Sequence, residues 1–173
     1  MNIIIEGTDG TGKSTLAKHL QDNFNLKYQH SSSETDNNFE YHFELLDSKE
    51  NIVLDRFQLG EIIYPMFTPE RESKITLSQA VMLSRMEDTL TIILYASDTS
   101  VLKGRIHERG ETYSPLYDTI NELFKLLGET FELLEVPVLL LDVCEFKDNE
   151  LFEEVNKYVC FKFNKWYLWT LIK

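Results

Sequence analysis

The chain has 173 residues, of which 43% are hydrophobic, and this size and composition are typical of one compact domain with a substantial core. The formal net charge of −12 argues against a general nucleic-acid binder, because such proteins need a basic face to displace counterions from the phosphate backbone. Two cysteines, Cys144 and Cys160, are too few for a disulfide framework and lack the paired spacing of a zinc site, which favours a cytoplasmic protein.

The first predicted element is a strand. Residues 2–6 contain three consecutive isoleucines and are followed by Gly7, a pattern typical of a strand buried on both faces. From Lys13 onward apolar residues recur at helical spacing, so a glycine-rich loop joins this strand to a helix. No leader peptide precedes the strand and no apolar stretch is long enough to span a bilayer, so we expect no membrane association.

The loop between strand and helix carries the strongest motif. Residues 7–14 have the sequence Gly-Thr-Asp-Gly-Thr-Gly-Lys-Ser, the complete phosphate-loop pattern Gly-x4-Gly-Lys-Ser. Its backbone N–H groups point at phosphate oxygens near the positive end of the following helix. We expect Lys13 to reach the β- and γ-phosphates of ATP, and Ser14 to bind Mg²⁺. The predicted phosphate-binding residues are Gly7, Asp9, Gly10, Thr11, Gly12, Lys13, Ser14 and Thr15.

Strands and helices alternate along the rest of the chain. The pattern predicts further strands at 27–30, 51–55, 91–95 and 138–142, and further helices at 39–46, 77–88, 99–109 and 120–135. Five short apolar strands separated by helices predict an α/β fold of three layers, with a parallel sheet of about five strands and helices on both faces. This is the P-loop NTPase arrangement, in which ligands bind beyond the carboxyl ends of the strands. We treat residues 1–173 as a single domain, because no linker or repeat interrupts them.

The strand at residues 51–55 ends with an acid and a base. Asp55 and Arg56 fall at the sheet edge where the phosphate loop lies. Asp55 is a candidate ligand of the Mg²⁺ ion. Arg56 is a candidate for an acceptor phosphate or the transferring group, because its forked guanidinium matches phosphate oxygens. The structural alternative is a solvated pair of charges after a strand.

Two of these motifs resemble those of a known family. Residues 5–15 are similar to the Glu-Gly-x-Asp-Gly-x-Gly-Lys-Ser-Thr signature of thymidylate kinases, and Asp55-Arg56-Phe57 resembles their Asp-Arg-Tyr/Phe motif. The resemblance implies a kinase that uses ATP and Mg²⁺ to phosphorylate a deoxynucleoside monophosphate such as dTMP. It also implies that Asp9 lies near the acceptor sugar or phosphate, and that Arg56 binds the acceptor phosphate.

The segment after the second strand differs from that family. Thymidylate kinases carry Arg-Glu-Pro-Gly-Gly there, whereas this chain has Ser31-Ser32-Ser33-Glu34, a divergence that would suit a phage or prophage relative. One alternative is a deoxynucleoside kinase, whose hydroxyl acceptor benefits from a general base; Glu6 and Glu34 are the available carboxylates. A second alternative is an ATP-binding module that transfers no phosphoryl group to a small molecule.

Three further residues are candidates for contacts with the acceptor. Tyr64 and Arg71 follow within a short span and would supply an aromatic platform and a phosphate ligand. Arg85, on the helix before the fourth strand, is a similar candidate. The structural alternative for these residues is a packed ring and surface ion pairs.

A basic pair predicts a lid at about residues 103–114. Arg105 and Arg109 are four residues apart, and therefore on one helix face, just before Gly110 and a polar turn. Such a lid would close over the phosphates, neutralise charge in the transition state and exclude water. The predicted catalytic residues are thus Lys13, Arg56, Arg105 and Arg109. The alternative is an exposed basic helix end that pairs with neighbouring glutamates.

Aromatic residues and lysines alternate at the carboxyl end, from Phe161 to Lys173. In a chain this acidic, we expect the segment to pack on the sheet or on a second subunit rather than on a nucleic acid or a membrane. A homodimer is therefore a hypothesis.

Overall fold

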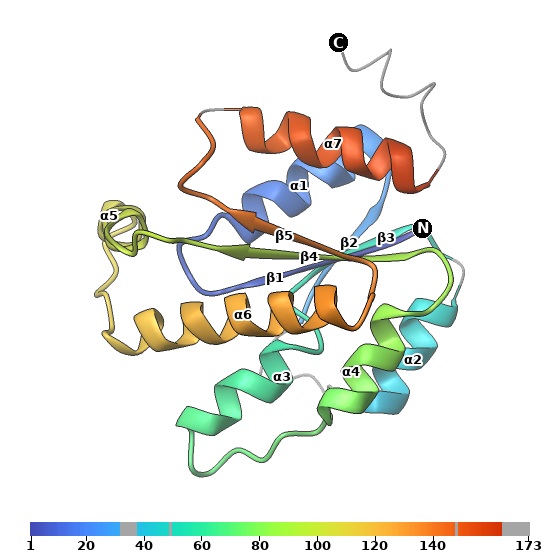
Figure 1. Ribbon diagram of the computed structural model, residues 1–173, viewed down its shortest axis with the longest axis horizontal. Helices are drawn as coiled ribbons and strands as arrows, with labels where there is room; N and C mark the ends of the chain where they lie inside the picture. Colours follow the sequence, from blue (N-terminus) through green and yellow to red (C-terminus); the bar gives the residue numbers. More distant parts are fainter. Residues whose placement is uncertain (32–37, 49, 148, 164–173) are drawn as a thin grey trace.

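The structure is a computed structural model that describes residues 1–31, 38–48, 50–147 and 149–163. Five parallel strands form a sheet in the order β2-β3-β1-β4-β5 (Figure 1). This arrangement confirms the predicted parallel sheet. The strands are β1 (Asn2–Gly7), β2 (Lys27–His30), β3 (Ile52–Asp55), β4 (Thr89–Tyr95) and β5 (Val138–Asp142).

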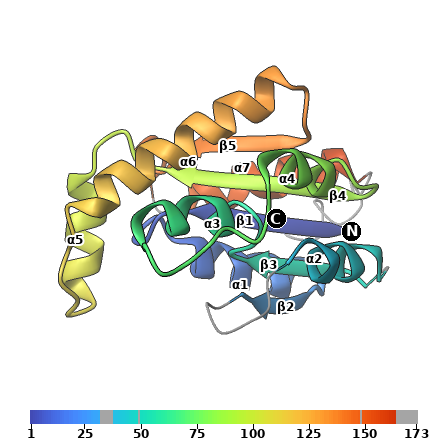
Figure 2. The ribbon, with the colours of Figure 1, turned by 90° about the horizontal axis from the view of Figure 1, so that it is seen from below.

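Helices cover both faces of the sheet, as predicted. In Figure 1, α1 and α7 lie on one face, and α2, α3, α4 and α6 lie on the other. Figure 2, seen from below, shows α5 beyond one end of the sheet. The helices are α1 (Lys13–Phe24), α2 (Phe39–Asp47), α3 (Gly60–Ile63), the 3₁₀ turn η1 (Tyr64–Phe67), α4 (Leu77–Ser84), α5 (Ser100–Glu108), α6 (Leu116–Leu133) and α7 (Glu150–Lys162).

The core explains why the strand sequences are continuously apolar. In β1, Ile3 and Ile5 pack under α1 and α7, whereas Ile4 faces the layer that contains α6. All three side chains are fully buried. Successive strand residues point to opposite faces, so a strand covered on both sides needs apolar residues at every position. The central strands are thereby buried, and they fix the position of the phosphate loop that follows β1.

Three details of the helices differ from the sequence prediction. The predicted helix 120–135 begins earlier, at Leu116, because Pro115 supplies a backbone already suited to a helix start. The predicted helix 77–88 ends at Ser84. The pattern did not predict α3 with η1, which are short, or α7, which buries Val155 and Val159 in the cluster under α1.

The carboxyl-terminal prediction can be followed only in part. Phe163 packs against the core cluster of α1 and α7, while Phe161 on α7 is exposed. Residues 164–173 lie outside the described part of the chain. Among the described residues, none of the helices combines the length and apolar character needed to cross a membrane.

Candidate functional site

The phosphate loop joins the end of β1 to the start of α1. Gly7 has a φ of +142°, and a Cβ at this position would lie 2.3 Å from the carbonyl oxygen of Leu94 on β4. Gly10 has a φ of +87°, and a Cβ there would lie 3.2 Å from the carbonyl oxygen of Leu102 on α5. Both positions therefore require glycine, for backbone conformation and for close packing. The loop is held between β4 and α5.

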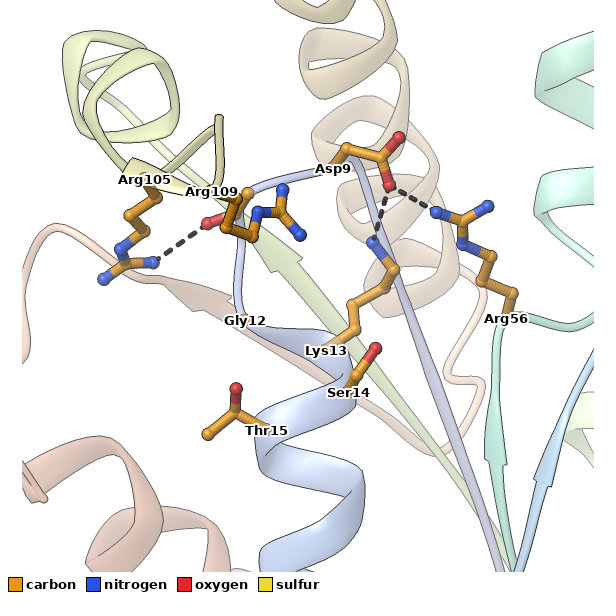
Figure 3. A pocket seen from close by; sticks show the side chains of 9 residues that line it. Asp9, Gly12, Lys13, Ser14, Thr15, Arg56, Arg105 and Arg109 are labelled. Atoms are coloured by element: carbon orange, nitrogen blue, oxygen red, sulfur yellow. Dashed lines mark hydrogen bonds and ion pairs between the residues drawn. The ribbon is translucent and has the colours of Figure 1, made fainter. Parts of the chain in front are cut away.

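A cavity of about 270 Å³ lies over this loop and is called the donor cavity below (Figure 3). Every residue that lines it is among those predicted from the sequence. They are Asp9, Gly10, Gly12, Lys13, Ser14, Thr15, Arg56, Arg105 and Arg109. Two predicted residues stand behind this surface: Gly7 ends β1, and Thr11 is buried with its hydroxyl donating to the Thr8 carbonyl at 2.8 Å.

Lys13 lines the donor cavity, and its ammonium group points toward Asp9 (Figure 3). Its Nζ donates to the carbonyl oxygen of Thr8 at 2.7 Å and lies 3.9 Å from Oδ1 of Asp9. Burial of the ammonium group, with the positive charge of Arg56 nearby, lowers the pKa of Lys13 to about 8. A bound polyanion would raise the pKa of this lysine toward its ordinary value.

Arg56 links the loop to the chain after β3. Its guanidinium forms an ion pair with Asp9 (Figure 3), and its backbone N–H donates to the Ile5 carbonyl at 3.0 Å. The residue has a φ of +66°, a left-handed conformation that is uncommon for residues with a side chain. Such unusual conformations persist where the surrounding structure fixes them, and they are frequent at functional sites.

The two predicted lid arginines both reach the donor cavity, and each also has a protein partner. Arg105 on α5 donates through Nη1 to the loop carbonyls of Gly10 and Thr11, at 3.2 and 3.4 Å. Arg109, at the end of α5, lies 3.6 Å from Glu111 as an ion pair. Arg105 therefore ties α5 to the outer side of the loop, in addition to any contact with a ligand.

The oxygen atoms near the donor cavity fit a Mg²⁺ ion, which prefers hydroxyl, carboxylate and phosphate oxygens. Ser14 is exposed in the cavity at the start of α1. Asp55 is fully buried at the end of β3, where Oδ2 accepts from the Tyr28 hydroxyl at 3.0 Å and Oδ1 has no hydrogen-bond partner among the described residues. Asp55 does not line the cavity, so Ser14 is the better placed of the two candidates.

A second cavity, of about 260 Å³, adjoins the first and is called the acceptor cavity below. Arg56 lines both cavities and so lies at their junction. The predicted residues Tyr64 and Arg71 line the acceptor cavity. The full set is Ser31, Arg56, Phe57, Gly60, Glu61, Tyr64, Thr68 and Arg71. Glu61 is not among the residues predicted from the sequence, and it lies on α3, a helix that the sequence pattern does not predict.

Arg85 lies elsewhere. Its guanidinium donates to the carbonyl oxygen of Leu134 at the carboxyl end of α6. Arg85 caps the end of α4, the helix that leads into the amino end of β4, whereas the phosphate loop lies at the carboxyl ends of the strands. The structure thus brings Tyr64 and Arg71, but not Arg85, to the cavities.

Glu6 supports the site from beneath. It is fully buried, and its Oε1 accepts from the backbone N–H groups of Phe57 and Leu59 at 3.1 and 2.7 Å. Burial raises the pKa of Glu6 to about 7, although these N–H groups and Lys13 act in the opposite direction. Glu6 therefore holds the segment that follows Arg56. Glu34, the other carboxylate considered from the sequence, lies outside the described residues.

We predict that ionisation of Glu6 makes the free energy of unfolding lower at pH 8 than at pH 4. Its raised pKa means that the folded state prefers the neutral form, so stability present below pH 4.5 is lost as the pH rises through 7. Between pH 4 and pH 8, wild type should lose roughly 3 kcal/mol relative to Glu6→Gln in chemical denaturation. Glu132→Gln, at an exposed position on α6, is the control, and a Glu6→Gln curve parallel to wild type would contradict the prediction.

Comparison with known proteins supports the fold. No protein-family model and no curated protein matches the chain. Among solved structures, the YorR protein from Bacillus subtilis in complex with phosphorylated GDP is 24% identical, with a TM-score of 0.73 over 92% of this chain and 95% of that one. Deoxyadenosine kinase from M. mycoides with bound dCTP is 18% identical (TM-score 0.60; 92% and 98% covered). Shikimate kinase from Acinetobacter baumannii with shikimate is 12% identical (TM-score 0.55; 95% and 93% covered). The chain therefore has the fold of the P-loop kinases.

Proposed function

We propose that the protein transfers the γ-phosphoryl group of ATP to the phosphate of a deoxynucleoside monophosphate, with dTMP as the acceptor that the sequence resemblance implies. One observation carries the proposal. Arg56 lies at the junction of two cavities, one built on a complete phosphate loop and the other of a size for a small molecule. A guanidinium at this junction would hold an acceptor phosphate beside the γ-phosphate of the donor.

The donor cavity would bind MgATP through the loop backbone and Lys13. Ser14 would hold the Mg²⁺ ion, whose charge would offset that of the phosphates, and Asp55, buried at the end of β3, is the second candidate ligand. Arg105 and Arg109 would face the charge that spreads over the transferring group. Positioning and charge stabilisation supply most of the catalysis in reactions of this class.

The carboxylates near the junction favour a phosphate acceptor over a sugar hydroxyl. A phosphate oxygen is already anionic and needs no general base, whereas a hydroxyl benefits from one. Glu6 lines neither cavity and its Oε1 accepts from backbone N–H groups, and Asp9 is paired with Arg56 and lies near Lys13. Among the described residues these contacts support a phosphate-binding junction rather than a basic catalyst.

The test is to identify the products formed from MgATP and a panel of deoxynucleosides and deoxynucleoside monophosphates. We expect diphosphates from one or more monophosphates. Phosphorylated nucleosides alone would instead support a deoxynucleoside kinase, the activity named for the M. mycoides structure. ATP binding or hydrolysis with no phosphorylated acceptor would support a binding module.

Arg56→Lys should raise the KM for the monophosphate by on the order of tenfold, because lysine keeps the charge and loses the two-pronged contact. The KM for ATP should change less. Arg85→Lys is the matched control, since Arg85 lies on the Leu134 carbonyl and away from both cavities. Steady-state kinetics would contradict the role of Arg56 if Arg56→Lys raised the KM for the monophosphate no more than Arg85→Lys did.

ATP binding should take up a proton above pH 8. Lys13 has a pKa of about 8, and a bound triphosphate raises the pKa of a nearby ammonium group. ATP affinity should therefore fall as the pH rises above 8, by up to about tenfold per pH unit. Calorimetry in two buffers of different ionisation enthalpy measures this uptake. Lys13→Ala should bind ATP weakly and without the uptake, and equal uptake in both proteins would refute the role of Lys13.

A further inference from the structure

Asp9 is an acid in a cavity that otherwise collects positive charge. The described residues that line the donor cavity include the bases Lys13, Arg56, Arg105 and Arg109, and Asp9 is the one carboxylate among them. The backbone of a phosphate loop binds phosphate through its N–H groups, but the side chain of Asp9 carries the same sign of charge as that ligand. This carboxylate therefore acts on a phosphate in some way other than direct binding.

One oxygen atom of Asp9 is shared between two cations. Its Oδ1 accepts from Nη2 of Arg56 and lies 3.9 Å from Nζ of Lys13 (Figure 3). The proposed function assigns the donor phosphates to Lys13 and the acceptor phosphate to Arg56. A phosphate bound to either cation would lie close to the carboxylate, and like charges at short range repel each other. Asp9 thus competes with phosphate for the same N–H groups.

The surroundings of Asp9 limit how far solvent screens this repulsion. The side chain of Asp9 is 26% exposed and that of Lys13 is 5% exposed. Charge interactions are stronger where water is excluded, and salt screens mainly the exposed ones. Glu111, which lies 3.6 Å from Arg109, is 55% exposed and is therefore screened more. Of these two carboxylates, Asp9 acts more strongly on a phosphate in the donor cavity.

Asp9 also offsets the repulsion between Lys13 and Arg56. The charge of Arg56 lowers the pKa of Lys13, whereas the charge of Asp9 raises it. A role limited to holding the two cations predicts that removal of the carboxylate weakens phosphate binding. Competition with phosphate predicts the opposite, so the two roles can be separated by the sign of the change.

We propose that Asp9 weakens the binding of phosphates at Lys13 and Arg56, and that it thereby favours dissociation of the product nucleotides. The inference rests on the proposed function, in which these two cations bind the donor and acceptor phosphates. After transfer, ADP and the phosphorylated acceptor would both keep a phosphate at this junction. The carboxylate of Asp9 would pair with each cation as its product leaves.

Calorimetric binding of inorganic tripolyphosphate tests the inference without any contact to a sugar or a base. At pH 6, well below its pKa of about 8, Lys13 is charged. Asp9→Asn keeps the size of the side chain and an oxygen that can accept from Arg56, and it removes the charge. It should bind tripolyphosphate on the order of tenfold more tightly than wild type. Asp9→Glu, which keeps the charge, should show no such gain. Equal or weaker binding by Asp9→Asn would overturn the inference.

Glu129→Gln is the control for net charge. The chain has a net charge of −12, so the loss of any carboxylate favours the approach of an anion over a long range. Glu129 lies 3.6 Å from Lys125 on α6 and lines neither the donor nor the acceptor cavity. A gain in Glu129→Gln as large as that in Asp9→Asn would assign the effect to net charge and overturn the inference. If Asp9→Asn does not fold, Asp9→Ala, which also lacks the charge, takes its place.

The dissociation rate of ADP tests the effect on product release. Changes in contacts within a binding site act mainly on dissociation, so Asp9→Asn should release a fluorescent ADP analogue several-fold more slowly in stopped-flow displacement. The association rate should change less. An unchanged dissociation rate would overturn the effect on release and leave the proposed function intact. If wild type bound neither tripolyphosphate nor ADP, the donor site of the proposed function would itself be overturned.

Discussion

The ion pair between Arg56 and Asp9 links the phosphate loop to the segment after β3. Hydrogen bonds from the backbone near Arg56 to Ile5 and Glu6 fix the position of this segment. Asp9 belongs to the phosphate loop after β1, and Arg56 follows β3, the strand beside β1 in the sheet. Neighbouring parallel strands bring their carboxyl ends to one edge, so two residues 47 positions apart in sequence meet without a long connection. Beneath them, Glu6 binds the backbone after Arg56 and limits how that segment can move.

The side chains of Glu6, Lys13 and Arg56 form one cluster of charges in which burial disfavours the charged forms of Glu6 and Lys13. Lys13 and Arg56 lie together near a carboxylate that is fully removed from water, so each charge shifts the proton affinity of the others. Desolvation raises the pKa of the acid and lowers that of the lysine, which brings both toward neutrality. A phosphate ligand would supply the negative charge that this cluster is built around. A bound phosphate would therefore stabilise the charged form of Lys13.

The fold and the residues of the donor cavity could be predicted from the sequence, because both depend on patterns within short, continuous segments. The phosphate loop is a contiguous motif whose residues act through the backbone they share, and the strand pattern follows from burial on both faces. The acceptor cavity was predicted only in part. Tyr64 and Arg71 were found because they are chemically distinctive, but Glu61 is an ordinary acid on a four-residue helix that has no detectable period. Arg85 was misplaced because helical position alone does not say at which end of a strand a side chain lies.

Gly10 allows α5 to pack closely against the phosphate loop, in addition to its predicted role in phosphate binding. The space that a side chain would need there is taken by the backbone of Leu102 and by the side chain of Ile106, both on α5, and Arg105 from the same helix holds the loop carbonyls. These contacts hold the phosphate loop against α5, where the predicted lid begins. If the predicted lid moves, these contacts favour movement of the segment after Gly110 rather than of α5. A glycine in a phosphate loop can therefore be required by the close packing of a neighbouring helix as well as by phosphate binding.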